Sequence, residues 1–150
     1  FDAGYKFHLE IGGSDFKHLE KQITALSASD YISTFGLLPL SGVAEKMQQS
    51  HALILFSENE TQGCVLVEAN ACGIPVISSK VGGVPEFVNE NTGVLVEKNN
   101  VEELYLAMKK VLLQKVNFES PEILHQQIKE KYSPKKIAEA FSDVYEFILK

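Results

Sequence analysis

Residues 52–78 read ALILFSENETQGCVLVEANACGIPVIS, in which two short apolar runs flank a longer segment. The first run, residues 52–56, is apolar throughout, which is typical of a central parallel strand covered on both faces. Residues 75–78 form the second strand-like run. The segment between them is helical in pattern over residues 63–71, and Gly73 suits a left-handed position at its C-terminus. A strand, a helix and a second strand in this order predict a βαβ unit of a parallel sheet.

The same alternation extends outward from this unit. Apolar residues at intervals of three and four predict helices over 16–26 and 41–49, and Ser41 is a suitable N-cap for the second helix. Further strands are predicted over residues 7–11, 31–35 and 92–96.

Only helical patterns follow residue 100. The segment 100–103 resembles a capping box, and the pairs Ser120-Pro121 and Ser133-Pro134 each place a cap residue before a proline at the first helical position. The predicted fold is therefore α/β, a Rossmann-like parallel sheet flanked by helices, in a single domain over residues 1–150. Because the chain opens on Phe1 and leads almost at once into a strand, we expect it to be cut from a longer protein.

The composition is that of a folded domain. Hydrophobic residues make up 45% of the 150, and 20 acidic against 14 basic residues give a formal net charge of −6. These values argue against disorder and against sequence-independent binding of nucleic acid or anionic lipid, which needs clustered lysine and arginine. No apolar run reaches the roughly 20 residues of a membrane span. With only Cys64 and Cys72, we expect buried, reduced thiols in the cytoplasm.

Two carboxylates follow the first apolar run. Ligands of doubly wound sheets bind beyond the carboxyl ends of the strands, so these carboxylates are candidates for a binding site. Glu60 lies in the loop before the predicted helix, and Glu68 lies more than one turn inside it. The backbone amides of residues 63–65 lie between them and offer donors to an anion. The alternative is structural, since acidic residues near a helix start favour the helix dipole and Glu68 also suits a solvated surface.

A second loop, residues 80–86, follows the predicted strand that ends near residue 78. It contains the pair Gly82-Gly83 ahead of a short helix. Such a turn can cradle phosphate with its backbone amides, although a glycine pair is also common in ordinary turns.

Taken together, these motifs resemble the nucleotide-sugar signature of retaining GT-B glycosyltransferases, family four in particular. The resemblance rests on residues 57–63, 68–78 and 82–86, and it extends to Gly12–Glu20, Phe35-Gly36 and Tyr132–Pro134. Nearly all of the chain is similar to the C-terminal, donor-binding half of such an enzyme. The resemblance thus implies the C-terminal half of a GT-B fold, truncated at its N-terminus.

The resemblance also implies roles for individual residues. Glu60 matches the family's first glutamate, which binds hydroxyls of the donor sugar beside the reacting carbon and is the catalytic candidate. Glu68 matches the second, which accepts hydrogen bonds from the ribose diol. Leu38 matches the position whose backbone reads the base edge, and a role as a core leucine stays open. The remaining donor-binding candidates act through their backbone; they are Gly63, Cys64, Val65, Leu66, Gly82 and Gly83.

The implied activity is transfer of a hexose-type sugar from a nucleotide diphosphate to a glycan or another acceptor, with retention at the anomeric carbon. No cofactor and no metal are expected, and the four histidines show no metal-ligand spacing. The implied partners are the nucleotide sugar and an N-terminal acceptor domain of the same protein, and the implied location is the cytoplasm or the inner face of a membrane. Without that domain, the isolated chain is expected to be inactive.

Two departures from the family pattern bear on the donor. Gln62 stands where an aromatic residue is common, which changes the shape of the sugar pocket. The family's Arg and Lys that neutralise the diphosphate lie upstream of the part that resembles Phe1.

Three other kinds of protein stay open at this point. A Rossmann dehydrogenase needs a G-x-G-x-x-G turn, but residues 12–17 lack the later glycine. A flavodoxin-like or receiver-type binding module without catalysis needs aspartates at the ends of its first and third strands, and the third strand here ends in Phe56-Ser57. A GT-B epimerase or phosphorylase shares the architecture without the glutamate pair.

Overall fold

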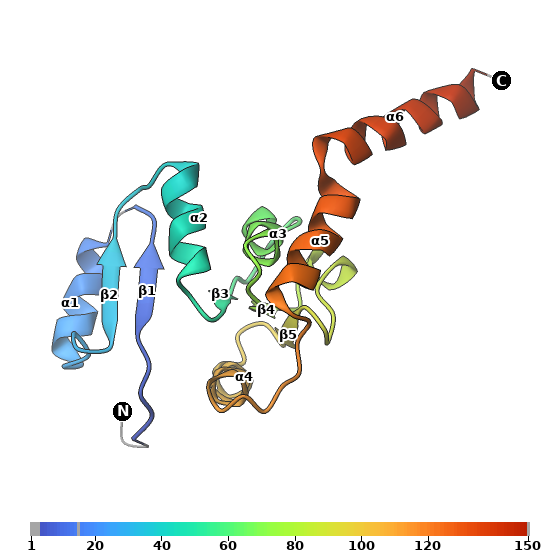
Figure 1. Cartoon of the computed structure of the whole chain (residues 1–150). Helices are drawn as coiled ribbons and strands as arrows, with labels where there is room; N and C mark the ends of the chain where they lie inside the picture. The colour runs from blue at the N-terminus through green and yellow to red at the C-terminus, as the bar shows by residue number, and fades with distance from the viewer. Residues whose placement is uncertain (1–3, 15, 150) are drawn as a thin grey trace. The chain divides into compact units, whose positions relative to one another are not determined.

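The computed structural model describes residues 4–14 and 16–149 (Figure 1). Contacts divide the chain into two compact units, Phe1–Val43 and Ala44–Lys150, where the sequence predicts one domain. Asp15, a member of the glycine-rich motif over residues 12–20, lies outside the described residues. No helix in the described part of the chain is long and apolar enough to cross a membrane.

The first unit is a βαβ element. Strand β1 (Leu9–Gly12) pairs in parallel with β2 (Ile32–Phe35), and helix α1 (Lys17–Ala25) connects them. A side chain at Gly12 would overlap the ring of Phe35, so glycine allows the two strands to pack closely at this point.

Helix α2 (Leu40–Gln48) begins one residue earlier than predicted. The carbonyl of Pro39 accepts a hydrogen bond from the amide of Val43 (3.0 Å), which makes Pro39 the last residue before the helix. Ser41 therefore lies inside the helix, and its assignment as N-cap is wrong.

The second unit contains a three-stranded parallel sheet. Its strands are β3 (Leu53–Leu55), β4 (Val76–Ser79) and β5 (Gly93–Val96), in the order β3-β4-β5. All four residues of β4 are buried, whereas β3 is half-buried. The central strand of this sheet is thus β4, and the prediction that residues 52–56 form the central strand is wrong. An apolar run indicates that both faces of the sheet are covered at that strand. It does not indicate how many other strands pair with it.

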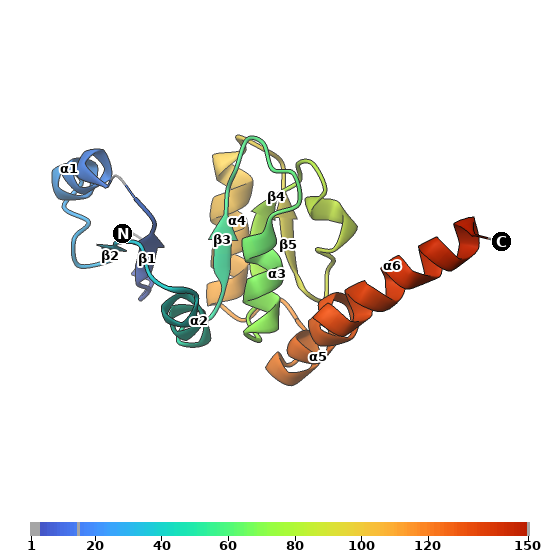
Figure 2. The same ribbon diagram turned by 90° about the horizontal axis from the view of Figure 1, so that it is seen from above.

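Helices cover both faces of this sheet, as predicted. Figure 2 shows α3 (Cys64–Ala71) on one face and α4 (Val101–Leu112) on the other. On the α4 side, Ile77, Val96 and Ala107 form a buried cluster. A 3-10 turn, η1 (Val84–Glu86), follows the glycine pair. This arrangement directs the loops after β3, β4 and β5 to one edge of the sheet.

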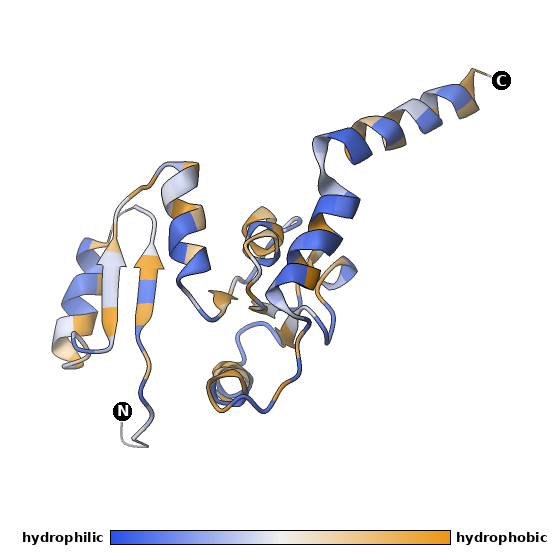
Figure 3. Ribbon diagram, in the orientation of Figure 1, coloured by the Kyte–Doolittle hydropathy of each residue, from blue (hydrophilic) through white to orange (hydrophobic). Residues whose placement is uncertain are grey.

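Two helices complete the chain. Helix α5 (Pro121–Tyr132) packs against α3, where a side chain at the left-handed Gly73 would lie 2.9 Å from Pro121. Helix α6 (Pro134–Ile148) has no buried residue, and hydrophobic residues recur along its length (Figure 3), among them the exposed Phe141, Val144 and Tyr145. The predicted caps are confirmed, because the hydroxyls of Ser120 and Ser133 each accept a bond from a backbone amide three residues on.

Candidate functional site

The Glu60 loop connects β3 to α3. Glu60 is half-buried, and its Oε1 atom accepts a hydrogen bond from the amide of Thr61 (3.1 Å). The loop ends at Gly63, which is buried and left-handed with a φ of 73°. A side chain at Gly63 would meet Cδ1 of Leu66 at 2.9 Å and Cγ of Glu60 at 3.3 Å. Glycine at this position therefore allows the loop and the helix to approach each other closely.

The N-terminus of α3 exposes unused backbone donors. The amide of Leu66 donates to the carbonyl of Gly63 (2.8 Å), while the amides of Cys64 and Val65, at the first helical positions, have no acceptor within the helix. No side chain among the described residues caps this end. Leu66 itself is buried in the core and anchors the first turn. The arrangement has the donors and the dipole that an anion prefers.

Glu68 is exposed on α3, just over one turn inside the helix as predicted, and one turn before Cys72. Burial raises the pKa of the Cys72 thiol, and the negative charge of Glu68 raises that pKa further. Glu68 and Cys72 therefore lie on the same side of the helix.

This proximity predicts a change in thiol reactivity. In the Glu68→Gln variant one of the two effects is lost, so the pKa of Cys72 should fall and its alkylation by iodoacetamide should begin at lower pH. Mass spectrometry of the chain alkylated over a pH series measures this, with a Glu90→Gln chain as the control. Cys72 is half-buried, whereas Cys64 is exposed, so the prediction that both thiols are buried is wrong for Cys64. An unchanged pH profile for Cys72 would contradict the proximity of Glu68.

The glycine pair lies directly against the Glu60 loop. The amide of Gly83 donates to the carbonyl of Thr61 (2.8 Å). Gly82 is left-handed with a φ of 51°, and a side chain there would overlap the carbonyl oxygen of Glu60. At Gly83 a side chain would lie 2.7 Å from the carbonyl oxygen of Thr61. The two loops therefore form one unit, in which the glycine pair supports the backbone that carries Glu60.

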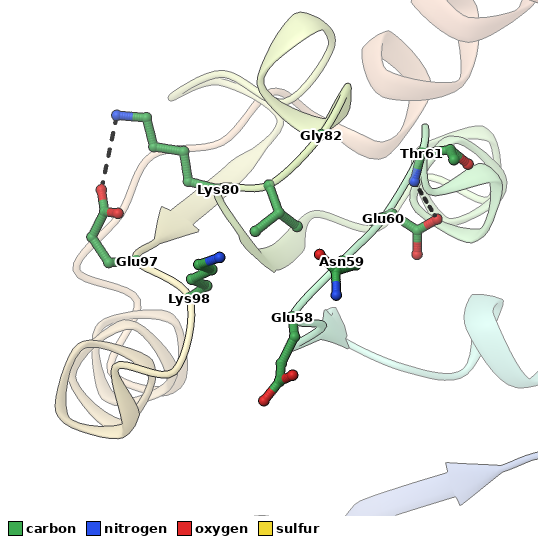
Figure 4. A pocket seen from close by; sticks show the side chains of 9 residues that line it. Glu58, Asn59, Glu60, Thr61, Lys80, Gly82, Glu97 and Lys98 are labelled. Atoms are coloured by element: carbon green, nitrogen blue, oxygen red, sulfur yellow. Dashed lines mark hydrogen bonds and ion pairs between the residues drawn. The ribbon is translucent and has the colours of Figure 1, made fainter.

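An open pocket of about 620 Å³ lies where these loops meet (Figure 4). Its walls are residues 58–61 after β3, 80–82 after β4 and 97–98 after β5. The Nζ atom of Lys80 lies 3.9 Å from a carboxylate oxygen of Glu97. Among the described residues no group of three His, Cys, Asp or Glu side chains is arranged to hold a metal ion.

The structure brings most of the predicted site residues to one edge of one sheet. Glu60, the N-terminus of α3 and the glycine pair meet there, and Glu68 follows on α3. Leu38 belongs to the other unit, where it follows β2 with 38% of its surface exposed. Sequence reasoning did not include Lys98 in the site, although its place just after a predicted strand was a usable signal.

Known proteins share this pattern over almost the entire chain. Residues 2–140 match the model of the family described as glycosyl transferases group 1. The chain belongs to this family. The match favours a glycosyltransferase over a dehydrogenase or a receiver-type module.

Curated relatives are about three times as long as the part that this chain matches. A subunit of phosphatidylinositol N-acetylglucosaminyltransferase from Arabidopsis thaliana is 31% identical over 144 residues, which cover 93% of this chain and 31% of that protein. Its Homo sapiens counterpart is 31% identical over 140 residues, 91% of this chain and 29% of that protein. The chain thus spans about a third of the length of these glycosyltransferases.

Solved structures show the fold. The lipopolysaccharide outer core galactosyltransferase WaaB superposes with a TM-score of 0.79 at 22% identity, covering 94% of this chain and 41% of that one. A glycosyltransferase from Rickettsia africae gives a TM-score of 0.81 at 23% identity, covering 97% and 41%. The predicted fold is confirmed as that of the C-terminal domain of GT-B glycosyltransferases.

Proposed function

We propose that this chain is the donor-nucleotide-binding half of a retaining glycosyltransferase, which moves a hexose-type sugar from a nucleotide diphosphate to a glycan or another acceptor. The observation that carries the proposal is the meeting of Glu60, the open N-terminus of α3 and the glycine pair at the carboxyl edge of the sheet. The names of similar proteins agree with a hexose-type donor: N-acetylglucosaminyltransferase for the relatives and galactosyltransferase for WaaB. A further structural neighbour is Anabaena Alr3699/HepE in complex with UDP, with a TM-score of 0.74.

In this proposal the first turn of α3 receives the diphosphate. The amides of Cys64 and Val65 donate to its oxygens, and the helix dipole stabilises the charge that builds up as the diphosphate leaves. The amide of Gly63 lies on the sugar side of the same ligand, whereas the amide of Leu66 donates to the carbonyl of Gly63 and holds the turn. The leaving group is therefore stabilised without a metal ion.

The two glutamates contact opposite parts of the donor. The half-buried carboxylate of Glu60 accepts hydrogen bonds from sugar hydroxyls and faces the positive charge that develops at the anomeric carbon. Glu68, further along α3, accepts hydrogen bonds from the ribose diol. Gly82 and Gly83 keep the Glu60 backbone in place.

We propose that the complete enzyme has a second domain, because its curated relatives are about three times as long as this chain. A site of this kind closes between two domains, and closure excludes water. The family's Arg and Lys, which lie upstream of the part that resembles Phe1, each supply a charge-assisted hydrogen bond to the diphosphate worth about 1.5 to 3 kcal/mol. Without these two bonds, the isolated chain should bind donor more weakly by roughly two to four orders of magnitude. We therefore propose that the isolated chain binds donor weakly and does not turn over, and that the full protein works in the cytoplasm or at the inner face of a membrane.

An amide chemical-shift titration of the chain tests the donor site. UDP, GDP and inorganic pyrophosphate are each expected to shift the amide signals of residues 63–66, since all three carry a diphosphate. Uridine, which has no phosphate, is expected to leave these signals unchanged. The Glu68→Ala variant should weaken UDP binding and leave pyrophosphate binding unchanged, because of these two ligands UDP has a ribose diol and pyrophosphate has none.

The matched control is Glu90→Ala, another exposed glutamate in the same unit, which should change the binding of neither ligand. If pyrophosphate leaves residues 63–66 unshifted both in this chain and in one extended to the length of its curated relatives, the helix N-terminus is not the diphosphate site and the proposal fails.

A further inference from the structure

The pocket beside Glu60 lies apart from the groups assigned to the diphosphate. Its walls are the loops after β3, β4 and β5, whereas residues 63–68, which include the first turn of α3, are not part of its lining. Glu60, which is assigned to the transferred sugar, does line the pocket. A group held there would therefore lie next to the transferred sugar and leave the diphosphate site free.

The charged side chains of the pocket favour neither an anion nor a cation. Three carboxylates and two ammonium groups line it; they belong to Glu58, Glu60, Glu97, Lys80 and Lys98. The Nζ atom of Lys80 lies 3.9 Å from a carboxylate oxygen of Glu97, so these two charges offset each other. Figure 4 shows Lys98 directed toward the middle of the pocket and Glu58 directed away from it. An anionic ligand would meet carboxylates and a cationic ligand would meet lysines, so a charge of either sign lowers the affinity.

Polar groups of both hydrogen-bonding kinds are free in the pocket. The side chains of Asn59, Thr61 and Lys98 line it and have no hydrogen bond or ion pair with any described residue. Asn59 follows β3 and Lys98 follows β5, and β4 lies between these strands, so the two side chains come from opposite walls. A carboxamide and a hydroxyl each donate and accept, and an ammonium group donates. Such a set suits the hydroxyl groups of a sugar or a polyol, because each of them also donates and accepts.

The lining offers little to an apolar ligand. Among the described residues that form it, Val81 alone has a hydrophobic side chain. None of the large hydrophobic side chains that are exposed in the described part of the chain belongs to it. Sites for apolar ligands are lined predominantly by hydrophobic and aromatic side chains. The pocket therefore suits a ligand that is both polar and uncharged.

We propose that this pocket binds the acceptor, and that the part of the acceptor held there is a neutral ring with several hydroxyl groups, such as a hexose or an inositol. Asn59 and Lys98 hold the ring from opposite sides through its hydroxyls. A phosphate, a carboxylate or an ammonium group of the acceptor lies outside the pocket. This inference rests on the proposed function, because it takes Glu60 as the place of the transferred sugar.

The first test compares three forms of one ring: glucose, glucose 6-phosphate and glucosamine as its ammonium ion. Each is added to the chain in the presence of UDP-glucose, and amide chemical shifts are the readout. Glucose is expected to shift residues 80–82 and 97–98 and to bind about two- to fivefold more tightly than either charged form. Equal or tighter binding of a charged form would overturn the proposal. So would unshifted signals with glucose, both in this chain and in one extended to the length of its curated relatives.

The second test changes the order of the three forms. In Lys98→Glu, glucosamine should become the tightest ligand and glucose 6-phosphate the weakest, a reversal that a loss of folding cannot produce. Asn59→Ala should weaken glucose binding about two- to tenfold, because one hydrogen-bonding side chain is lost. The matched control is Lys110→Glu, which changes an exposed lysine of α4 outside the pocket lining and should keep the wild-type order. An unchanged order in Lys98→Glu would mean that Lys98 does not contact the ring, and the inference would be wrong.

The third test separates the acceptor from the donor. UDP alone should shift residues 63–66 and leave residues 97–98 unshifted. If UDP-glucose shifts residues 97–98 by itself and prevents free glucose from binding there, the pocket belongs to the donor sugar; the inference is then wrong and the proposed function stands. If glucose binds but UDP shifts no signal of residues 63–66 in either chain, the proposed function fails, and the assignment of the ring to an acceptor fails with it.

Discussion

Replacing Gly82 with alanine is expected to lower the free energy of unfolding of the chain by about 3 kcal/mol, since two costs add. Gly82 has a φ of 51°, where an L side chain costs roughly 1 to 2 kcal/mol. The new methyl group would also overlap the backbone carbonyl of Glu60, and overpacking of this kind costs typically about 1 to 3 kcal/mol. A backbone group cannot move aside as a flexible side chain can, so both loops must shift.

Urea unfolding followed by circular dichroism measures this loss. The matched control is Gly36→Ala, because a side chain at Gly36 meets nothing within 4 Å and its backbone is not left-handed, so the same substitution should change stability little. If the loops relax instead, part of the cost should appear as shifted amides at Glu60 and Thr61. A Gly82→Ala chain with wild-type stability and unshifted loop amides would contradict the observed contact.

The second large effect concerns turnover. In an enzyme that joins this chain to the additional length of its curated relatives, Glu60→Gln is expected to lower kcat about 100-fold, a loss typical of a removed electrostatic contact to the transition state. The amide keeps the size of the side chain and its bond with Thr61, but it loses the negative charge that faces the anomeric carbon. Binding of UDP should stay within about twofold of wild type, because Glu60 is assigned to the sugar and not to the nucleotide.

Glu90→Gln is the matched control for this experiment. Glu90 is an exposed glutamate in the same unit, outside the pocket lining, and no donor contact is assigned to it. Steady-state kinetics with both variants should give a large loss of kcat for Glu60→Gln only. Equal losses would mean that the effect is not specific to the Glu60 carboxylate.

Local features of the chain were predictable from the sequence because their causes lie within one or two helical turns. The left-handed Gly73, the serine caps before Pro121 and Pro134, and the position of Glu68 inside α3 all depend on nearby backbone groups. Resemblance to a family then supplied the roles of Glu60 and Glu68, which spacing alone left open. The chain's membership in that family bears out the resemblance, and the roles themselves stay proposals.

The sequence by itself thus determined the order of strands and helices and the side chains available after each strand. Only the tertiary structure decided that β4 is the central strand of its sheet, that Gly82 lies on the carbonyl of Glu60, and that Lys98 joins the same pocket. These features depend on which strands pair and in which register. Periodicity records which faces of an element are apolar, whereas pairing is fixed by contacts between residues far apart in the chain.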